Sequence, residues 1–476
     1  MKKVYRAHPL MILSFIKPFL FILIIPFIKA AAQYLLNGEI DDILGLESVF
    51  FAAISVWAVA RCITFRLICE QDTVTVKSGV IFRKQATIRV LRLSSVRTEQ
   101  NPLDMLCRSL TFNINTEAGS KRSSDFKFKL SLKDAKEVSR LLYSEYKPSR
   151  IHFSAVKVAV LAATTSSAFG GMLIGVPVIN RIGKLIGVGI SEMLFDEINN
   201  VSSKVQNFFP PIVNTVSLIF LLAYGVSFLY SFFKFINFKL LLGDGELEVR
   251  SGFFVKTRTS FKKRSVNNAL IVQSPLMFLV RRYALKVSVG GFGESKSESQ
   301  ILIPSGSYKE IKAGFSEYFP FLAPKGNPIT AKHNAVVKSR FLFWPGLYLI
   351  GVIGVSLYLA SVFRDFDRLI LFCSTVALSL VFYYAFICLF EYRKGELVLG
   401  DNIYVKSAKR LRTCELYCPK QKIGQIRITQ FWTDKWQKTC RIKLTVCSEG
   451  ADNIRIRHLD NETVLTAVNE CFNLNE

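Results

Sequence analysis

The chain has 476 residues, of which 50% are hydrophobic, and its mean hydropathy is +0.30. This composition is typical of a membrane protein and argues against an ordinary water-soluble globular protein. The formal net charge is +26, and most of the excess lies in three polar segments, 65–152, 237–340 and 391–476.

Six apolar runs along the chain are long enough to cross about 30 Å of hydrocarbon. They lie near residues 10–36, 46–64, 153–176, 210–236, 341–363 and 368–390. A run of this kind can also form a buried core helix, but the arrangement in three pairs disfavours that alternative. The sequence therefore predicts transmembrane hairpins at 1–64, 153–236 and 331–390.

The orientation of these hairpins follows from the charged residues beside them. The first run resembles a signal peptide, because basic residues precede it and Ala30–Ala32 imitate a cleavage site. Lys17 and Pro18 interrupt its apolar core, however, which favours a retained helix. Since Lys and Arg near span ends favour the cytoplasmic side, we predict that both termini and the polar segments are cytosolic.

Between the hairpins, the polar segments alternate apolar and polar residues as β-strands do. In the first, 65–152, Gly79 occupies a predicted turn in which a positive φ is favourable, and Ser131–Asp134 is a predicted helix start. The second, 237–330, and the third, 391–476, also end in an amphipathic helix. Several strands followed by one helix predict a small β-sandwich or open barrel.

Parts of these segments are duplicated. Val74–Gly79 (VTVKSG) recurs as Leu247–Gly252 (LEVRSG), and Gln100–Leu103 (QNPL) recurs at the same spacing as Gln273–Leu276 (QSPL). A fainter third copy begins at Ile426 (IRITQ). The repeating unit is therefore a pair of spans followed by one basic domain.

These motifs, with the entry segment Arg6–Leu10 and Thr164–Ser166, resemble the bacterial membrane-flanked PH-domain family. The three-copy form resembles the YdbT-type membrane proteins. The resemblance implies an α+β membrane protein with six transmembrane helices in three hairpins, each followed by a PH-like domain with a C-terminal helix. It also implies a role in envelope stress, including resistance to membrane-active peptides, beside a smaller protein with the same domain.

The third predicted domain departs from the pattern. Gln430–Thr433 (QFWT) stands where the other copies have a Pro-Leu turn, which predicts a surface displaying Phe431, Trp432 and Trp436. Five of the ten cysteines lie in this domain, but their spacing is not that of a structural zinc site. We interpret them as reduced thiols in and around a β core.

No catalytic, cofactor or metal motif is evident in the sequence, so an enzyme is not predicted. Gly290–Gly293 lacks the strand and helix context of a nucleotide-binding loop, and the four histidines are scattered. Nucleic-acid binding is disfavoured because an RNP-like aromatic motif and a recognition helix are missing from the sequence.

Basic clusters are the strongest surface signal. Juxtamembrane Lys and Arg each gain about 1 kcal/mol near an anionic membrane. An ordinary solvated basic face is the alternative interpretation. The candidate residues for binding lipid or a partner are Lys262, Lys263, Arg264, Arg281, Arg282, Arg83, Lys84, Lys121 and Arg122.

Two further features lie in the predicted spans and their loops. Lys17 is a candidate functional charge within the first span. The loop 178–207 has apolar residues at near-helical spacing, which predicts either an amphipathic helix on the outer membrane face or a packing brace.

Together these features predict a non-enzymatic scaffold or binding protein of the bacterial cytoplasmic membrane. Its expected partners are the lipid bilayer, including anionic lipids, and either a second copy of itself or a smaller PH-domain membrane protein. The alternative is a transporter or lipid-handling device built from the three hairpins, in which polar residues such as Lys17 would converge at the midplane.

Overall fold

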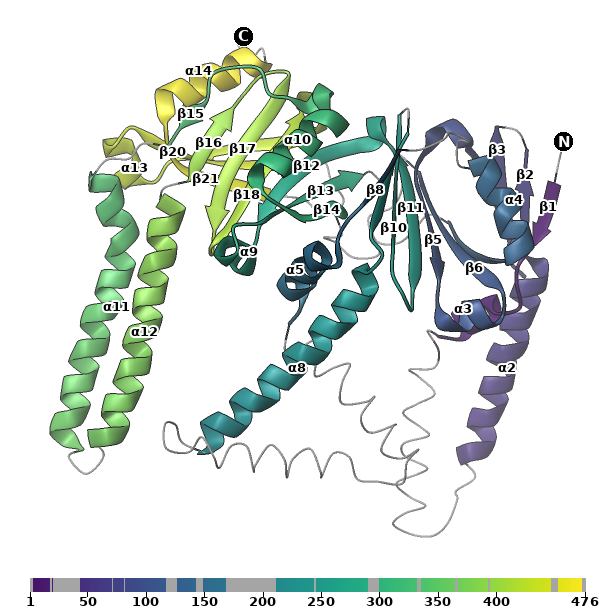
Figure 1. Ribbon diagram of the computed structural model, residues 1–476, viewed down its shortest axis with the longest axis horizontal. Coiled ribbons are helices and arrows are strands. Elements are labelled where there is room, and N and C mark those ends of the chain that lie inside the picture. Colours follow the sequence, from purple (N-terminus) through teal and green to yellow (C-terminus); the bar gives the residue numbers. More distant parts are fainter. Residues whose placement is uncertain are drawn as a thin grey trace. The chain divides into compact units, whose positions relative to one another are not determined.

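The computed structural model (Figure 1) describes most of the chain. The described residues are 3–17, 19, 43–70, 72–80, 82–116, 126–142, 149–167, 211–243, 245–289, 299–331, 335–363, 367–392, 394–446 and 453–472. The chain divides into two compact units. The first unit contains Met1–Phe153, Phe233–Ser265 and Val289–Ser295; the second contains Ser154–Phe232, Val266–Ser288 and Lys296–Glu476.

One order of elements occurs three times: three strands, a 3-10 turn, a strand, a short helix, two strands and a longer helix. The first group is β2 (Arg66–Cys69), β3 (Thr73–Ser78), β4 (Lys84–Arg89), η1 (Val90–Arg92), β5 (Leu93–Gln100), α3 (Pro102–Leu106), β6 (Ser109–Thr116), β7 (Phe126–Ser131) and α4 (Leu132–Leu142). The second is β9 (Lys239–Leu242), β10 (Glu246–Ser251), β11 (Lys256–Lys262), η2 (Lys263–Ser265), β12 (Val266–Gln273), α9 (Pro275–Leu279), β13 (Tyr283–Val289), β14 (Gln300–Gly306) and α10 (Tyr308–Tyr318). The third is β16 (Gly395–Val398), β17 (Asn402–Lys409), β18 (Arg412–Pro419), η5 (Lys420–Lys422), β19 (Ile423–Thr429), α13 (Trp432–Trp436), β20 (Thr439–Val446), β21 (Asn453–Asp460) and α14 (Asn461–Phe472).

A short strand adds to the edge of each group: β1 (Lys3–Arg6) pairs with β2, β8 (Ser149–His152) with β9, and β15 (Ile329–Thr330) with β16. The described strands form four sheets, with the orders β1-β2-β3-β4, β7-β6-β5-β11-β10-β9-β8, β14-β13-β12-β18-β17-β16-β15 and β19-β20-β21. Each seven-stranded sheet therefore joins the last strands of one group to the first strands of the next.

The two joining seams are antiparallel and use corresponding positions. In the first unit β11 pairs with β5, so that Ser260 lies opposite Val96 and Lys256 opposite Gln100. In the second unit β18 pairs with β12, so that Tyr417 lies opposite Ala269. An exposed sheet edge is a template for unwanted pairing, and each seam covers one.

Each unit has its own apolar core. In the first, Phe112 and Phe128 stack with ring centroids 5.4 Å apart, and Val138 of α4 is buried in the same cluster. In the second, Leu416 and Val405 meet Leu270, which extends from β12 into the core of the third group. Because β12 of the second group packs into the core of the third group, these two groups share one sheet and are not separate domains.

The short helix after the fourth strand of the first group is held by a buried carboxylate. Asp104 accepts hydrogen bonds from Ser109 Oγ (2.7 Å) and Lys129 Nζ (2.6 Å), and Asn101 N also donates to it (3.3 Å). In the third group α13 begins at Trp432, and Asp434 is buried there in the same way. The divergent sequence of the third group thus keeps the turn that Pro-Leu makes in the others.

The predicted fold class, six transmembrane helices in three hairpins each followed by its own PH-like domain, is wrong. Among the described residues, two helical stretches are long and apolar enough to cross a membrane: Phe341–Val362 in α11 (Ala335–Val362) and Ile370–Tyr392 in α12 (Asp367–Tyr392). Three further apolar stretches, Ala52–Thr64 in α2 (Ile43–Thr64), Ala155–Thr165 in α5, and Ile219–Phe235 in α8 (Pro211–Phe235), are shorter. The four sheets with their shared seams replace the predicted row of separate sandwiches.

The predicted span 153–176 illustrates why apolar runs alone gave a wrong prediction of the transmembrane helices. Helix α5 is Ala155–Thr165, only 11 residues, and at 1.5 Å per residue it falls far short of about 30 Å. The hydroxyl groups of Thr164 and Ser166 donate to the carbonyls of Leu161 (2.8 Å) and Ala162 (2.6 Å), which satisfies the last turn and ends the helix. The amphipathic loop predicted at 178–207 lies outside the described residues.

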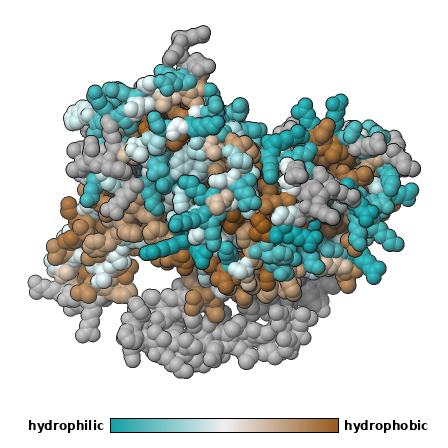
Figure 2. All heavy atoms as spheres, turned by 45° about the horizontal axis from the view of Figure 1, so that its top comes forward, coloured by the Kyte–Doolittle hydropathy of each residue, from teal (hydrophilic) through white to brown (hydrophobic). Residues whose placement is uncertain are grey.

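The helices α11 and α12 form a hairpin that extends away from the third group of strands (Figure 1). Ser374 Oγ donates to Ser356 Oγ across the pair at 2.7 Å. Only 6% and 0% of their span-length windows are buried inside the protein, which is unlike the core helix of a soluble protein. In Figure 2 hydrophobic residues gather on this hairpin, whereas hydrophilic residues predominate over the strands.

Candidate anion-binding pocket at the α11–α12 hairpin

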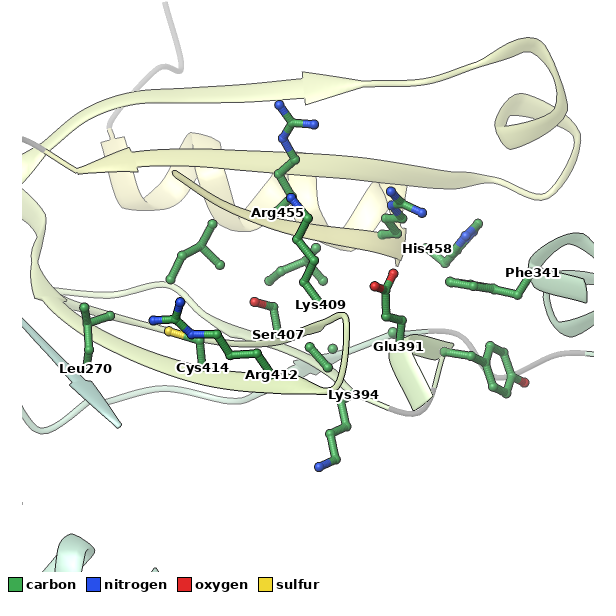
Figure 3. Close-up of a pocket in the computed structure, with 17 residues that line it drawn as sticks. Leu270, Phe341, Glu391, Lys394, Ser407, Lys409, Arg412, Cys414, Arg455 and His458 are labelled. Atoms are coloured by element: carbon green, nitrogen blue, oxygen red, sulfur yellow. The ribbon is translucent and has the colours of Figure 1, made fainter. Parts of the chain in front are cut away.

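A cavity of about 390 Å³ lies in the second unit, where α11 and α12 meet the strands of the third group. We call it the hairpin pocket. Figure 3 shows the residues that line it. They are Leu270, Ala331, Phe341, Glu391, Tyr392, Lys394, Gly395, Ser407, Ala408, Lys409, Arg412, Cys414, Ile454, Arg455, Ile456, Arg457 and His458.

The charge of this lining is strongly positive. Five of its side chains are lysine or arginine, and among the described residues the one carboxylate in the lining is Glu391. Lys409 and Arg412 lie opposite each other across the turn between β17 and β18. Arg455 and Arg457 are exposed on β21, where the intervening Ile456 is buried in the core. These four cations thus come from the three strands β17, β18 and β21, and all of them line one cavity.

The turn between β17 and β18 has an unusual backbone. Both of its central residues, Arg410 and Leu411, have positive φ (50° and 62°), the geometry of the tight two-residue hairpin that normally favours Asn or Gly. Arg410 N donates to Glu391 Oε1 at 2.9 Å, which ties the turn to the end of α12. Glu391 therefore positions the turn that carries Lys409 and Arg412.

His458 closes one end of the pocket. It has a left-handed backbone (φ 62°) beside a register shift between β20 and β21, as expected for a β-bulge that redirects a side chain. Its ring lies 4.9 Å from that of Phe341 on α11. Figure 3 shows both rings together at the end of the cavity opposite Leu270 and Cys414.

Lys394 differs from the other cations. Its ammonium group lies 4.3 Å from the centre of the Phe390 ring and donates to Thr413 Oγ1 at 3.2 Å. Burial, with a further contribution from Lys406, lowers the pKa of Lys394. Figure 3 shows it pointing away from Lys409 and Arg455, so it supports the wall rather than the interior.

A second cavity of about 1310 Å³ adjoins the hairpin pocket and shares Phe341, Glu391, Lys409, Arg457 and His458 with it. Its remaining lining is partly aromatic and partly cationic: Phe343, Trp344, Tyr383, Tyr384, Phe431, Arg410 and Arg441 belong to it, with Ser339, Ile387, Cys388 and Gln437. Cations at one end and aromatic helix faces at the other suit a ligand with an anionic head and an apolar tail.

The lining of the hairpin pocket suits the binding of negative charge. Among the described residues, no group of three His, Cys, Asp or Glu side chains could hold a metal ion. Besides lysine and arginine, the titratable residues in the described lining of the hairpin pocket are Glu391, Tyr392, Cys414 and His458. The site resembles a receptor for negative charge.

The candidate residues predicted from the sequence lie elsewhere. Lys262 Nζ donates to the carbonyls of Val90 and Leu91 (both 3.1 Å), and Arg264 Nη2 donates to that of Leu91 (3.0 Å). These two cations therefore fasten η1 of the first group to the end of β11. Lys263 lies beside them in η2 and is half-buried.

The other predicted cations that the structure describes do not line either of these cavities. Arg83, Lys84 and Arg281 are exposed, and Arg282 is half-buried at the start of β13. Lys121 and Arg122 lie outside the described residues. Lys17, the predicted charge of the first span, is exposed.

Sequence reasoning missed the hairpin pocket because its cations are scattered along the chain. The alternation of Ile454–Arg457 (IRIR) did carry a signal, since period-2 alternation places both arginines on one face of the strand. That Lys409 and Arg412 join them depends on the pairing of β17 with β18, which local sequence does not specify.

Comparison with known proteins gives one family match. The sequence model of the family described as bacterial PH domain matches residues 12–146 and 189–312, more than half of the chain. No curated protein and no solved structure matches the chain significantly.

Proposed function

Since the chain belongs to the bacterial PH domain family, we propose that it is a non-enzymatic, membrane-attached binding protein whose hairpin pocket holds the head group of an anionic phospholipid. The observation that carries this proposal is the position of the pocket. A cavity lined by one carboxylate and five cations, of which Lys394 belongs to the wall, lies at the end of two helices that are long and apolar enough to cross a membrane.

The physical argument begins with the hairpin. Trp344, Tyr348 and Ile350 of α11 are 55%, 52% and 71% exposed in the protein, and so many large apolar side chains in water would be unfavourable. A bilayer removes this cost. It also brings the hairpin pocket to the level of the lipid head groups, where arginine binds phosphate through paired N–H donors.

The charge also favours an orientation. Lysines and arginines beside the ends of spans favour the cytoplasmic side of a bacterial membrane, and the surface of that leaflet is negative. We therefore propose that the strands and both termini are cytosolic and that α11 and α12 cross the membrane as one hairpin. The division into three domains at 65–152, 237–330 and 391–476 remains a prediction.

The cellular role and the partners are proposed from the family resemblance and not from the geometry of the pocket. A scaffold in envelope stress, working with a second copy or with a smaller PH-domain membrane protein, is what the resemblance implies, and a lipid-binding pocket is compatible with it. The alternative of a transporter receives no support from the described residues, because the hydroxyl groups of Thr164, Thr165 and Ser166 bond to carbonyls of their own helix.

The test is to count the lipids that stay bound when the full-length protein is released from nanodiscs in a mass spectrometer. Arg412→Gln with Arg455→Gln removes two cations from the pocket. Arg427→Gln, an exposed residue of β19 outside the pocket, is the single-charge control.

We expect wild-type protein to retain anionic phospholipid in preference to zwitterionic phospholipid. The double variant should lose this preference by about tenfold for each charge-assisted contact removed. Equal retention of anionic lipid by wild type and the double variant would show that the hairpin pocket is not the binding site.

A further inference from the structure

A second basic cavity, of about 830 Å³, lies in the first unit between α4 and strands β10 and β11. We call it the α4 groove. Among the described residues its lining carries six cations and no carboxylate. The cations are Lys136, Arg140, Lys239, Arg250, Lys256 and Arg258; Thr98, Gln100, Leu110, Leu132, Ala135, Ser139, Asn237, Ser251, Gly252 and Thr257 complete it.

Comparison with the second unit explains how the groove arises. Gln100 and Gln273 are the same motif position, so the two seams can be aligned: Ser260, opposite Val96, corresponds to Tyr417, opposite Ala269.

The helices can be aligned in the same way. Ser131 accepts from Asp134 N before α4, as Ser307 accepts from Glu310 N before α10. Counting from these caps, Ser139 of α4 corresponds to Phe315 of α10.

In the second unit aromatic side chains fill this place. The rings of Phe315 and Tyr417 lie only 4.1 Å apart, and those of Tyr404 and Tyr417 lie 5.0 Å apart. Tyr308 adds a hydrogen bond from its hydroxyl to Glu415 at 3.2 Å. The helix is thus packed onto the neighbouring strands of the sheet.

In the first unit the corresponding positions are small or charged. Ser139 and Ser260 replace the stacked pair, Glu248 replaces Tyr404, and Arg258 replaces Glu415. Ser139 lines the groove, so the space that the ring of Phe315 fills in the second unit stays open there, while Ser260 is buried nearby on β11. Exchanging a carboxylate for a guanidinium also changes the sign of the charge beside it.

Two of the four cations on the strands, Arg250 and Arg258, are held in place. Arg258 forms a fork with the buried Glu248, with Nε 2.7 Å from Oε1 and Nη2 2.9 Å from Oε2, and Arg250 Nε bonds to the same carboxylate. One carboxylate therefore orients two guanidinium groups, and the four remaining cations keep the groove strongly positive. Such pre-organisation lowers the entropic cost of binding an anion.

We propose that the α4 groove is a binding site for a ligand that carries several phosphate groups. Its six cations match multiple negative charges, and its volume admits more than one phosphate. The same chemistry is found in soluble polyphosphates and in phospholipid head groups. The proposal is independent of the hairpin pocket, which lies in the other unit.

The test uses the full-length protein in a phosphate-free amphiphilic polymer, with inorganic tripolyphosphate as the titrant in calorimetry. Ser139→Phe with Ser260→Tyr rebuilds the aromatic plug of the second unit. Lys136→Gln with Arg140→Gln removes two exposed cations without changing the packing. Lys133→Gln, on the same helix but outside the groove, is the matched control.

We expect wild type and the Lys133 variant to bind tripolyphosphate equally. The Lys136/Arg140 variant should bind about tenfold more weakly for each cation lost, and the plugged variant should not bind. A parallel arm counts phospholipids retained by the same variants in nanodiscs. Loss of retained phospholipid in the plugged variant, without tripolyphosphate binding by wild type, would identify a lipid head group as the source of the phosphate.

Two results would overturn the proposal. One is tripolyphosphate binding that survives in both the plugged and the Lys136/Arg140 variants. The other is the absence of both tripolyphosphate binding and groove-dependent lipid retention in wild type. Because Lys136 and Arg140 are exposed, their variant remains informative even if the plugged variant fails to fold.

Discussion

Asp104 is the residue whose replacement should destabilise the first unit most clearly. Its side chain is fully buried, and its partner Lys129 is only 15% exposed. In Asp104→Asn the amide oxygen still accepts from Ser109, but it leaves the ammonium group of Lys129 without a counter-charge. Breaking a buried ion pair costs about 3–5 kcal/mol, and we expect about 3 kcal/mol because the asparagine keeps part of the hydrogen bonding.

The effect should depend on pH in a defined direction. Burial alone would raise the pKa of Asp104, but the hydrogen bonds from Lys129 and Ser109 outweigh it and hold the pKa below its ordinary value. The unfolded chain therefore binds the proton more readily, and stability rises with pH. The contribution is present above about pH 4, the ordinary carboxyl pKa, and is lost as pH falls through the lower folded value.

Amide hydrogen exchange of α3, β6 and β7 is the appropriate measurement. A loss of about 3 kcal/mol should accelerate exchange there by about two orders of magnitude at pH 7, and the difference between wild type and variant should shrink in acid. Asp434→Asn is the control, because Asp434 is equally buried but its partner Arg441 is 40% exposed and can turn to water. Equal losses in both variants, or a loss at Asp104 that does not change with pH, would refute the reasoning.

Three further predictions concern single positions. Gly252→Ala should destabilise the protein by more than about 1 kcal/mol in thermal unfolding, because φ of Gly252 is +106° and a Cβ there would lie 1.9 Å from Val255 O. Gly225→Ala in α8 is the control and should not destabilise the protein, because a Cβ at Gly225 would meet open space. Burial raises the pKa of Glu415, so the contribution of this carboxyl group to stability falls as pH rises through that pKa. Glu415→Gln should therefore be at least as stable as wild type at pH 7 and should lose this advantage in acid. Clear destabilisation of the variant at pH 7 would contradict this reasoning. With the other tryptophans replaced by phenylalanine, Trp344 fluorescence should be quenched by brominated lipid, and unquenched emission would argue against insertion of α11.

Local features of the fold could be predicted from the sequence. Gly79 has the expected positive φ (120°), and α4 begins at Leu132, within the predicted helix start Ser131–Asp134. The span-length stretches of α11 and α12 also match their predicted positions closely. Each of these depends on a few neighbouring residues, such as a turn that needs glycine or a long uninterrupted apolar run.

The shared sheets could not be predicted in this way. The repeated motif marks Gln100, but it does not show whether the strand that ends there pairs with a neighbouring strand or with β11, more than a hundred residues later. The apolar residues of β12 illustrate the difficulty, because Leu270 enters the core of the third group while Ala269 points to the opposite face. A strand that is buried on both faces has the same sequence pattern whether it lies at the edge of one sandwich or joins two sandwiches.

The same limit applies to the sites. Clusters that are adjacent in sequence, such as Lys262–Arg264, attracted attention, yet Lys262 and Arg264 bond to carbonyl groups of η1. Both cavities instead collect cations from elements that lie far apart in the sequence, and the α4 groove has Ser139 where the second unit has the ring of Phe315. That a small side chain leaves space at one position becomes evident only when the corresponding position of the other unit is compared with it.

The seams also connect ligand binding with stability. In the first unit β11 covers the edge of β5, and Lys262 adds bonds to η1, so the strands of two successive groups form one body. A phosphate-bearing ligand in the α4 groove would contact α4 of the first group and β11 of the second at once. Because such a ligand binds the paired seam and not the separated strands, its binding energy adds to the stability of the pairing. In the second unit the ring of Phe315 on Tyr417 supplies that connection permanently. Two copies of one architecture thus differ in whether the contact across the seam is built in or supplied by a ligand.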